Sequence, residues 1–444
     1  MNILQEKWLP TDAGLCNPAG ALFTAKSFLW GRGDWDMAAF CFLHSLVQTA
    51  VVLQPARCPD RAHWEEFQST PPVDLHDWLS IDLGPTPWQC NTATGEVHVS
   101  RLLPETPGDH TLKKTSDIAK WQSDIVEHLT LSQATIALIS DNLWGTRCGS
   151  GYRAGARGEQ AVMTVLEPAK LEATMWERVW LNVLPADEWN DRQHRECTEN
   201  FYLPWTKPIP SASLTPENTH SLGILWQMPR RWRLSPDEDG LVRSAHRQNK
   251  GRDYDGWEKL HPLTPYFLRS DGTWTAAKVA AHTGFKDWAS LALRGRGEKT
   301  RPATVVLAIL DWAALSTPLR IRCCGWALGD SGAAGGWVDH VVPFYFKTVD
   351  ETESIERAVQ DADKQQYLLN KALKEVGISL GRSNEALMTR AEEEFYNRVL
   401  TNDFADERTA WKSYLKRLSQ SLFWEFVDCH RVDILKASRA FSRL

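Results

Sequence analysis

The stretch WKSYLKRLSQSLFWEF, residues 411–426, decides the fold of the C-terminal part of the chain. Its apolar side chains recur mostly at spacings of three and four residues, at Trp411, Tyr414, Leu415, Leu418, Leu422 and Phe426. Because an α-helix completes a turn in about 3.6 residues, this spacing places them on one helical face. The stretch therefore predicts an amphipathic helix over residues 403–427 that packs against other helices.

Helical spacing extends to both sides of this stretch. It covers three more segments, at residues 348–376, 384–400 and 432–441. Gly377 and Gly381 act as stop signals between the first two, and the loops are short enough for antiparallel neighbours. We therefore expect a four-helix bundle over residues 346–444.

Residues 1–345 have a different character, with short apolar runs among many prolines and glycines. One long apolar helix is predicted, DMAAFCFLHSLVQTAVV at 36–52. Short apolar runs predict strands at residues 3–4, 135–139, 162–166, 221–227 and 304–310. They do not alternate with helices in the βαβ order of a doubly wound sheet. The expected fold class is α+β, with a large irregular mixed domain over 1–345 followed by the bundle.

The composition fits a globular protein that keeps its cysteines reduced. Of its 444 residues 43% are hydrophobic and 24% charged, enough apolar material for a buried core. The N-terminus MNILQEKWLP is too charged for a signal peptide, and no apolar run approaches the roughly 18 residues of a membrane span. We therefore expect a soluble, cytoplasmic protein without a membrane partner. The nine cysteines form no CxxC pair, so neither disulfides nor a zinc ribbon is predicted.

A net charge of −6 argues against a protein that coats nucleic acid indiscriminately, because such binding needs a clear basic excess. Any nucleic-acid contact must therefore be local. Basic residues gather at 147–157, in PRRWR at 229–233 and in LRGRGEKTR at 293–301. Each cluster by itself is typical of a solvated surface.

The glycine-rich stretch RCGSGYRAGARGE, residues 147–159, contains little that could fill a core. Its glycines nearly reproduce the dinucleotide-binding fingerprint, but that fingerprint directly follows a strand and opens a helix. Here the preceding apolar run ends well before the glycines, and a predicted strand follows them. A solvated hairpin loop and a loop that lets DNA approach the backbone remain as interpretations.

The sequence contains no motif of a hydrolase, a P-loop NTPase or a metalloenzyme. Isolated acids and histidines such as Asp339 and His261 are more often structural than catalytic. We therefore expect no enzyme activity, no catalytic residue, no metal and no cofactor.

Seven segments, in order along the chain, carry a resemblance to a known family. They are NILQEKWLPT (2–11), DMAAFCFLHSLVQTAV (36–51), WLSIDLGPTPWQ (78–89), RCGSGYRAGARGE (147–159), MWERVWLNVLP (175–185), SLGILWQMPR (221–230) and EEEFYNRVL (392–400). In this order they resemble the CasA family, the large subunit of the type I-E CRISPR Cascade complex. The resemblance implies an RNA-guided surveillance complex in which guide pairing reads the target sequence and the large subunit reads a short flanking duplex motif, the PAM.

The resemblance also implies partners. They are the backbone, small and guide-end-binding Cascade subunits, the CRISPR guide RNA, double-stranded target DNA and a helicase-nuclease. The large subunit would start strand separation for R-loop formation and help to recruit the helicase-nuclease. A scaffold subunit that no longer reads DNA, and a nucleotide-binding enzyme that uses the glycine-rich stretch, are the alternatives.

DNA-contacting residues are assigned by the same resemblance. The family's glycine loop corresponds to Gly149, Ser150 and Gly151, where the missing side chains would let a duplex approach. Its minor-groove lysine corresponds to Lys250. Its strand-separating hairpin tip corresponds to Leu328, Gly329, Asp330 and Ser331. The Asn and Gln of some relatives are absent from this tip, so Leu328 is the expected apolar wedge.

Basic side chains near these loops are expected to contact phosphates or guide RNA. They are Lys113, Lys114, Arg147, Arg153 and Arg157. SPDEDGLVRSAHR, residues 235–247, replaces the cysteine pairs with which some relatives bind metal, so no zinc is expected.

Overall fold

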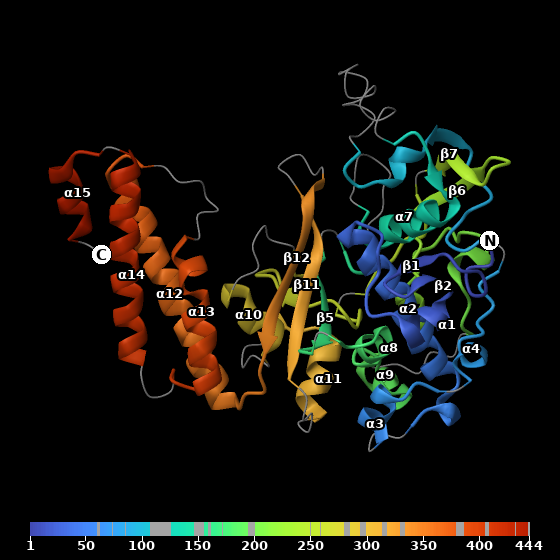
Figure 1. Cartoon of the computed structure of the whole chain (residues 1–444), viewed down its shortest axis with the longest axis horizontal. Coiled ribbons are helices and arrows are strands. Elements are labelled where there is room, and N and C mark those ends of the chain that lie inside the picture. The colour runs from blue at the N-terminus through green and yellow to red at the C-terminus, as the bar shows by residue number, and fades with distance from the viewer. Residues whose placement is uncertain are drawn as a thin grey trace. The chain divides into compact units, whose positions relative to one another are not determined.

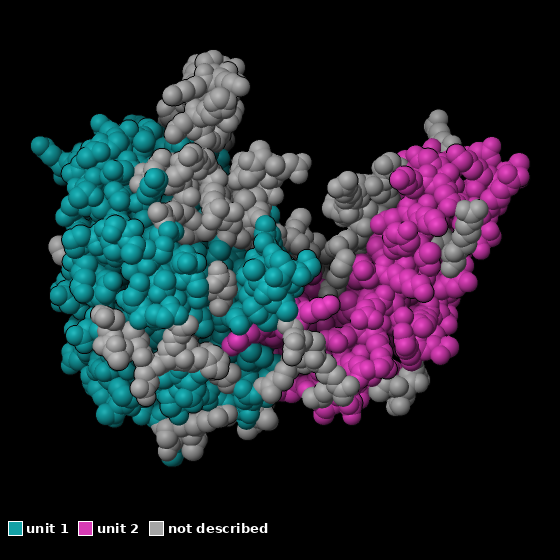
Figure 2. Space-filling model, turned by 180° about the vertical axis from the view of Figure 1, so that it is seen from behind, with its two compact units in different colours: residues 1–281, 303–341 teal, residues 282–302, 342–444 magenta. Residues whose placement is uncertain are grey.

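A computed structural model of the chain is shown in Figure 1. It describes residues 1–59, 63–72, 74–84, 86–106, 126–145, 155–158, 161–170, 172–193, 200–248, 250–257, 259–278, 285–293, 299–312, 318–328, 334–378, 386–404, 408–430 and 432–442. The chain divides into two compact units, coloured separately in Figure 2. Residues 1–281 and 303–341 form the first, and residues 282–302 and 342–444 form the second.

The first unit is a mixture of helices and short strands. Its strands are β1 (Leu9–Thr11), β2 (Gly14–Cys16), β3 (Gly95–His98), β4 (Leu129–Thr130), β5 (Met163–Pro168), β6 (Arg231–Pro236), β7 (Leu241–Gln248), β8 (Tyr266–Leu268), β9 (Trp274–Ala276), β11 (Leu319–Leu328) and most of β12 (Ala334–Phe344). Its α-helices are α1 (Pro18–Thr24), α2 (Gly33–Leu53), α3 (Trp64–Ser69), α4 (Leu75–Trp78), α7 (Leu131–Trp144), α8 (Met175–Trp180), α9 (Ala186–Gln193) and α11 (Thr304–Trp312). Short 3₁₀ helices lie at Pro55–Arg57, Val99–Leu102, Pro204–Thr206 and Ser221–Ile224.

The second unit is helical. It contains α10 (Phe285–Ala292), the short strand β10 (Thr300–Arg301), α12 (Val349–Glu375), α13 (Ala386–Thr401), α14 (Arg408–His430) and α15 (Ile434–Phe441). The mixed α+β fold class and the four C-terminal helices are confirmed. The predicted boundary after residue 345 differs from the observed division, which falls after residue 341 and assigns α10 to the second unit.

The position of α10 is explained by aromatic packing. Phe285 of α10 stacks on Phe395 of α13 with ring centroids 4.3 Å apart, and both side chains are fully buried. Trp288 of α10 also meets Phe395, edge to face. A fragment that ends at residue 345 would keep α10 but lose these partners.

The first unit is built around α2. Asp34 and Asp36 lie in its first turn, where carboxylates stabilise a helix N-terminus, and nearly all its remaining residues are buried. The helix predicted over residues 36–52 is thus confirmed. By length and composition α2 could also cross a membrane, so the expectation that no apolar run reaches that length is wrong. However, 83% of its apolar window is buried inside the molecule, as in the core helix of a folded domain.

Two sheets position the segments relevant to function. In the first, β6 and β3 pair antiparallel with opposite edges of β7. β4 also pairs antiparallel with β7, on the same edge as β3. In the second, β11 lies between β12 and the fully buried β5, with Leu319 opposite Pro168 and Cys324 opposite Met163. Only residues 329–333 join β11 to β12, too few for a parallel crossover, so these strands form a hairpin.

One of the five predicted strands is confirmed, 162–166 as β5, and the other four predictions are wrong. Residues 135–139 and 304–310 are helical, in α7 and α11. Both are short apolar runs buried nearly all round, and periodicity cannot distinguish a buried strand from a buried helix. Residues 221–227 begin with a 3₁₀ turn, and residues 3–4 form a turn.

Candidate nucleic-acid interface

The glycine-rich segment joins α7 to β5. Residues 146–154, which include Gly149, Ser150, Gly151, Arg147 and Arg153, lie outside the described residues, but both flanks are described. A capping box between Thr130 and Gln133 starts α7, and Gly145 ends it by donating its N–H to Asp141 O at 2.7 Å. The segment therefore follows a helix and precedes a strand, the reverse of the order that a dinucleotide-binding fingerprint requires.

The flank after the glycine-rich segment is held by Gln227. Ala156 N–H donates to Gln227 Oε1 at 2.6 Å. A Cβ on Gly155 would overlap that oxygen and lie 2.9 Å from Gln227 Cδ, so only glycine permits this approach. Gly158, in the left-handed region at φ +90°, closes the turn by donating to Gly155 O at 2.9 Å.

Arg157 is buried, which makes the predicted phosphate or guide contact wrong for this residue. Only 3% of it is exposed, and its guanidinium donates to Leu143 O and lies 5.5 Å from the centroid of the Trp144 ring. Burial lowers the pKa of the guanidinium, since it removes the charge from water. Arg157 therefore ties the second flank of the segment to the end of α7, where the first flank begins.

Lys250 is exposed in the loop after β7, with a left-handed backbone at φ 62°. The next residue, Gly251, is buried against the backbone before β6. A Cβ on Gly251 would overlap Pro229 O and lie 2.6 Å from Arg230 N. Lys250 thus extends from a loop whose base is packed backbone to backbone.

Arg252 anchors the other side of the Lys250 loop. Its N–H donates to Met228 O at 3.0 Å, and its side chain is 1% exposed. The guanidinium donates to Pro204 O at 3.0 Å and to Lys207 O at 2.7 Å, so carbonyl oxygens take the place of water around it. Residues 251–252 therefore give Lys250 a rigid base.

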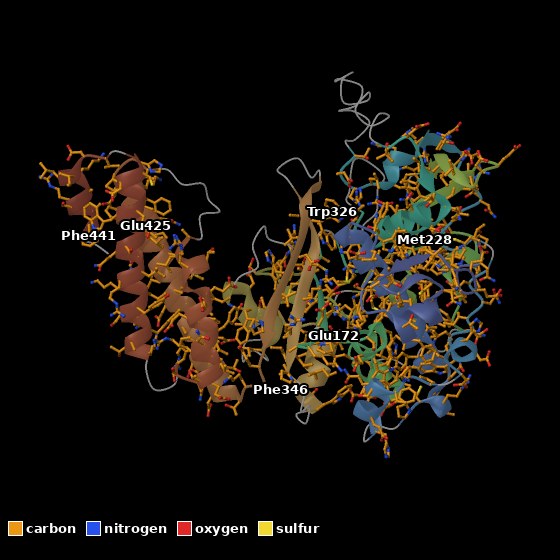
Figure 3. The ribbon with its side chains drawn as sticks, in the orientation of Figure 1. Glu172, Met228, Trp326, Phe346, Glu425 and Phe441 are labelled. Atoms are coloured by element: carbon orange, nitrogen blue, oxygen red, sulfur yellow. The ribbon has the colours of Figure 1, made fainter. Side chains whose placement is uncertain are left out.

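The start of β6 links this base to the end of α7. Trp232 Nε1 donates to Asp141 Oδ2 at 2.7 Å, and Arg230 N–H donates to Asn142 Oδ1 at 3.3 Å. A Cβ on Gly145 would lie 2.8 Å from Arg230 Nε. The first flank of the glycine-rich segment and the Lys250 loop therefore pack on the same short stretch, residues 229–232; Met228, which precedes it, is labelled in Figure 3.

The β11–β12 hairpin reaches the same place through tryptophans. Trp326 of β11, labelled in Figure 3, lies 6.0 Å from Trp337 of β12, and Trp337 meets Trp144 edge to face at 5.1 Å. Trp337 also packs on Gly33, where a Cβ would lie 2.7 Å from its Cδ1. Trp144 is thus in contact with both Arg157 and the hairpin.

Most of the predicted hairpin tip lies outside the described residues. Leu328 is the last residue of β11, but its side chain, like Gly329, Asp330 and Ser331, lies outside the described residues. Lys113 and Lys114 lie outside them too. The structure therefore brings together the flanks of the glycine-rich segment, the Lys250 loop and the hairpin stem around the C-terminal end of α7.

The sequence matches the family model of CRISPR-associated protein Cse1 over residues 2–421. The chain belongs to the Cse1 family. It is thereby a large subunit of a Cascade surveillance ribonucleoprotein, as the resemblance to the CasA family implied. A comparison with curated proteins gave no significant match.

Solved structures share the fold of this Cse1-family chain at low sequence identity. Thermus thermophilus CasA (Cse1) has a TM-score of 0.72 at 16% identity, covering 100% of this chain and 99% of that chain. Thermobifida fusca Cse1 has a TM-score of 0.72 at 16% identity, covering 100% and 96%. A chain of a CRISPR RNA-guided surveillance complex has a TM-score of 0.69 at 14% identity, covering 100% and 98%.

Sequence reasoning missed the residues that hold this Cse1-family site together. Gln227, Trp144, Trp337 and Arg252 carry the contacts described above, yet none belongs to a motif with a chemical meaning. The weak signal available was a tryptophan next to glycine, in the pairs Trp144–Gly145 and Gly336–Trp337.

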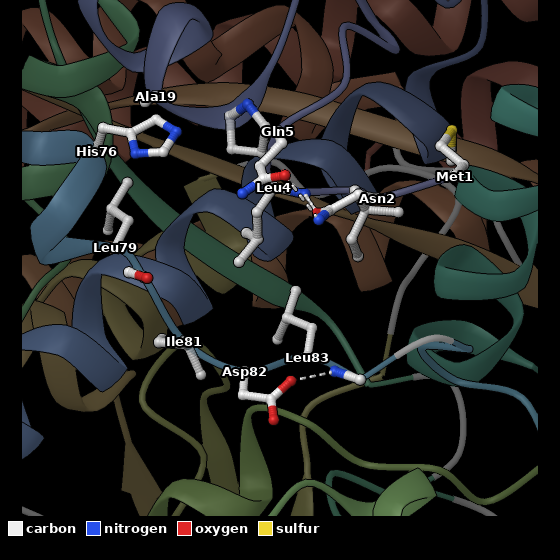
Figure 4. A pocket seen from close by; sticks show the side chains of 14 residues that line it. Met1, Asn2, Leu4, Gln5, Ala19, His76, Leu79, Ile81, Asp82 and Leu83 are labelled. Atoms are coloured by element: carbon white, nitrogen blue, oxygen red, sulfur yellow. Dashed lines mark hydrogen bonds between the residues drawn. The ribbon is translucent and has the colours of Figure 1, made fainter.

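A cavity of about 660 Å³ lies elsewhere in the first unit, between residues 1–5 and 76–84 (Figure 4). Its lining is mainly aliphatic, with His76 and Asp82 as its titratable side chains. Asp82 accepts a hydrogen bond from Gly84 N–H at 2.9 Å, and the lining offers no nucleophile paired with a base. Within the described parts of the chain, no group of three or more His, Cys, Asp or Glu is arranged to hold a metal.

Proposed function

We propose that this chain recognises the PAM in double-stranded target DNA and starts separation of the two strands for R-loop formation in its Cascade complex. One observation carries the proposal most directly. The glycine-rich segment, Lys250 and the β11–β12 hairpin are far apart in sequence, but their bases meet at one end of α7. Segments that touch one short duplex motif must converge in this way.

The three segments would have different tasks. Glycines at 149 and 151, with Ser150, would let a sugar-phosphate backbone approach the chain closely. The Lys250 ammonium would reach base-edge acceptors in the minor groove, which differ little between base pairs, so related PAM sequences would be tolerated. Leu328 to Ser331 would enter the duplex beside the PAM and unstack it.

The proposal extends to partners and location. The chain would assemble in the cytoplasm with the backbone, small and guide-end-binding subunits and a CRISPR guide RNA, and would help to recruit a helicase-nuclease. Lys113, Lys114, Arg147 and Arg153 would contact phosphates or guide RNA. In this role the chain binds and opens DNA without catalysing a reaction.

Replacing Lys250 with alanine is expected to weaken binding of PAM-bearing duplex by the assembled complex. Loss of a base-edge contact costs about 1–3 kcal/mol, roughly a 5- to 150-fold loss of affinity. The slope of log affinity against log salt should fall by at most about one, since one cation is removed. Titration with PAM-bearing and PAM-lacking duplex at two salt concentrations measures both effects.

Lys259 provides the matched control. It also has a left-handed backbone, at φ 71°, but its ammonium lies 5.2 Å from the centroid of the Trp274 ring. Lys259→Ala should leave PAM-dependent binding unchanged. If the Lys250→Ala complex binds PAM-bearing duplex like the parent, or loses both duplexes equally, the minor-groove role of Lys250 is wrong. If none of the site variants changes binding, the chain is a scaffold subunit.

A further inference from the structure

The basic stretch PRRWR, residues 229–233, crosses from the Lys250 base into β6. Successive strand residues face opposite sides of a sheet. Accordingly Trp232 and Leu234 are buried, whereas Arg231 and Arg233 are half-buried on the other face. The stretch thus places two guanidinium groups on one face of a sheet, with Cα atoms about 7 Å apart by the rise of a strand.

The opposite strand adds to this polar face and leads to Lys250. Arg231 pairs with Gln248 and Arg233 with His246 across the β6–β7 ladder. Arg231, Gln248 and Lys250 lie around one narrow gap, which Trp232 and Arg247 also line. Arg231 is therefore close to the loop that carries Lys250.

The charges of Arg231 and Arg233 are not neutralised by described parts of the protein. Neither guanidinium forms an ion pair or a side-chain hydrogen bond with a described residue, and both side chains are only half-buried. Glu96 of β3 lies opposite His246 and adds a carboxylate to this face of the ladder. A guanidinium with unused donors binds phosphate readily, since its planar fork matches two phosphate oxygens.

Arg243 of β7, on the hairpin that β6 and β7 form, shows the contrasting arrangement. Its guanidinium lies 2.6 Å from Glu127 Oε1 and 3.5 Å from Asp237 Oδ2. Two carboxylates already hold its charge, so it has little to offer a phosphate. The β6–β7 hairpin thus carries one arginine paired with carboxylates and two that are not paired with described carboxylates. Substituting each kind separately tests whether only the latter bind phosphate.

We propose that Arg231 and Arg233 bind the sugar-phosphate backbone of the target duplex beside the PAM. The inference rests on the proposed function, because a lysine that enters a minor groove from this loop has a phosphate backbone on each side of it. The two arginines sit on a strand fixed by the Trp232–Asp141 hydrogen bond, so they set the position of the duplex while Lys250 reads it. Phosphate contacts carry no sequence information, and their effect is independent of the PAM.

The test is a double variant, Arg231→Gln with Arg233→Gln, in the full-length chain within the assembled complex. PAM-bearing and PAM-lacking duplexes are titrated over a series of salt concentrations. We expect both affinities to fall by a similar factor, about tenfold at low salt, and the salt slope to fall by about one to two units. The double variant Arg231→Lys with Arg233→Lys keeps both charges and should retain most of the salt slope. Arg243→Gln should leave affinity and slope unchanged.

Other results would overturn the inference. An unchanged salt slope in a double variant that melts like the parent would mean that the arginines meet no phosphate of the duplex. Loss of guide-RNA binding or complex assembly with unchanged duplex affinity would assign them to RNA or a subunit instead. If the chain does not recognise the PAM at all, the result is distinguishable from these. Lys250→Ala would then have no effect on the preference for PAM-bearing over PAM-lacking duplex.

Discussion

Replacing Gly251 with alanine is expected to reduce PAM-dependent binding about as strongly as removing the Lys250 side chain, by roughly 5- to 150-fold. The new methyl group would overlap Pro229 O and lie 2.6 Å from Arg230 N. These are backbone atoms just before β6, and they cannot turn away as a flexible side chain could. The Lys250 loop must therefore shift, at a cost of about 1–3 kcal/mol for overpacking.

Binding and stability must be measured together for this variant. Titration with PAM-bearing duplex reports the position of Lys250, and thermal melting reports the fold. Gly240→Ala is the control, because Gly240 ends the turn between β6 and β7. Its φ is +75°, and no atom lies within 4 Å of the position that a Cβ would take. This variant should lower the melting temperature slightly and leave DNA affinity intact. Parental affinity for Gly251→Ala would show that the loop base does not position Lys250.

Replacing Phe395 with alanine is expected to destabilise the second unit by about 3–5 kcal/mol, the usual cost of removing a buried aromatic ring. Phe395 is fully buried and contacts Phe285, Trp288, Phe404 and Trp411. Its loss leaves a cavity between α10, α13 and α14. Because α10 contributes two of these rings, the helix should lose protection together with the bundle.

Native-state hydrogen exchange measures this effect unit by unit, which suits a chain whose two units need not unfold together. Amides of α10 and α12–α14 should lose protection, while β5 and α2 keep theirs. Tyr367→Ala on α12 is the control, since that side chain is 65% exposed. A loss below about 1 kcal/mol for Phe395→Ala, or a loss confined to α13, would contradict a shared core.

Spacing in the sequence was enough for the bundle, because amphipathic helices repeat about every 3.6 residues. Length was enough for α2, because its apolar run is much longer than a strand. It failed for α7 and α11, whose apolar runs are short and buried nearly all round. For α7 a usable signal did exist. Thr130 followed by Gln133 forms the capping box that starts the helix, and a strand would not need it.

The candidate site could be assigned residue by residue from the resemblance, but its assembly could not. The contacts that join its parts link Ala156 to Gln227 and Trp144 to Trp337, positions distant in sequence. Arg157 shows the limit most clearly. An arginine among glycines is typical of a solvated loop. Arg157 is buried instead, because its guanidinium lies over the Trp144 ring and donates to Leu143 O.

The most direct test of the central claim is to observe the duplex opening beside the PAM. A fluorescent base analogue, brighter when unstacked, is placed at the first base pair next to the PAM in a duplex that does not pair with the guide. We predict that emission rises only when the duplex carries the PAM and the complex contains this chain. An equal rise without the PAM or without this chain, or no rise at all, would contradict the account.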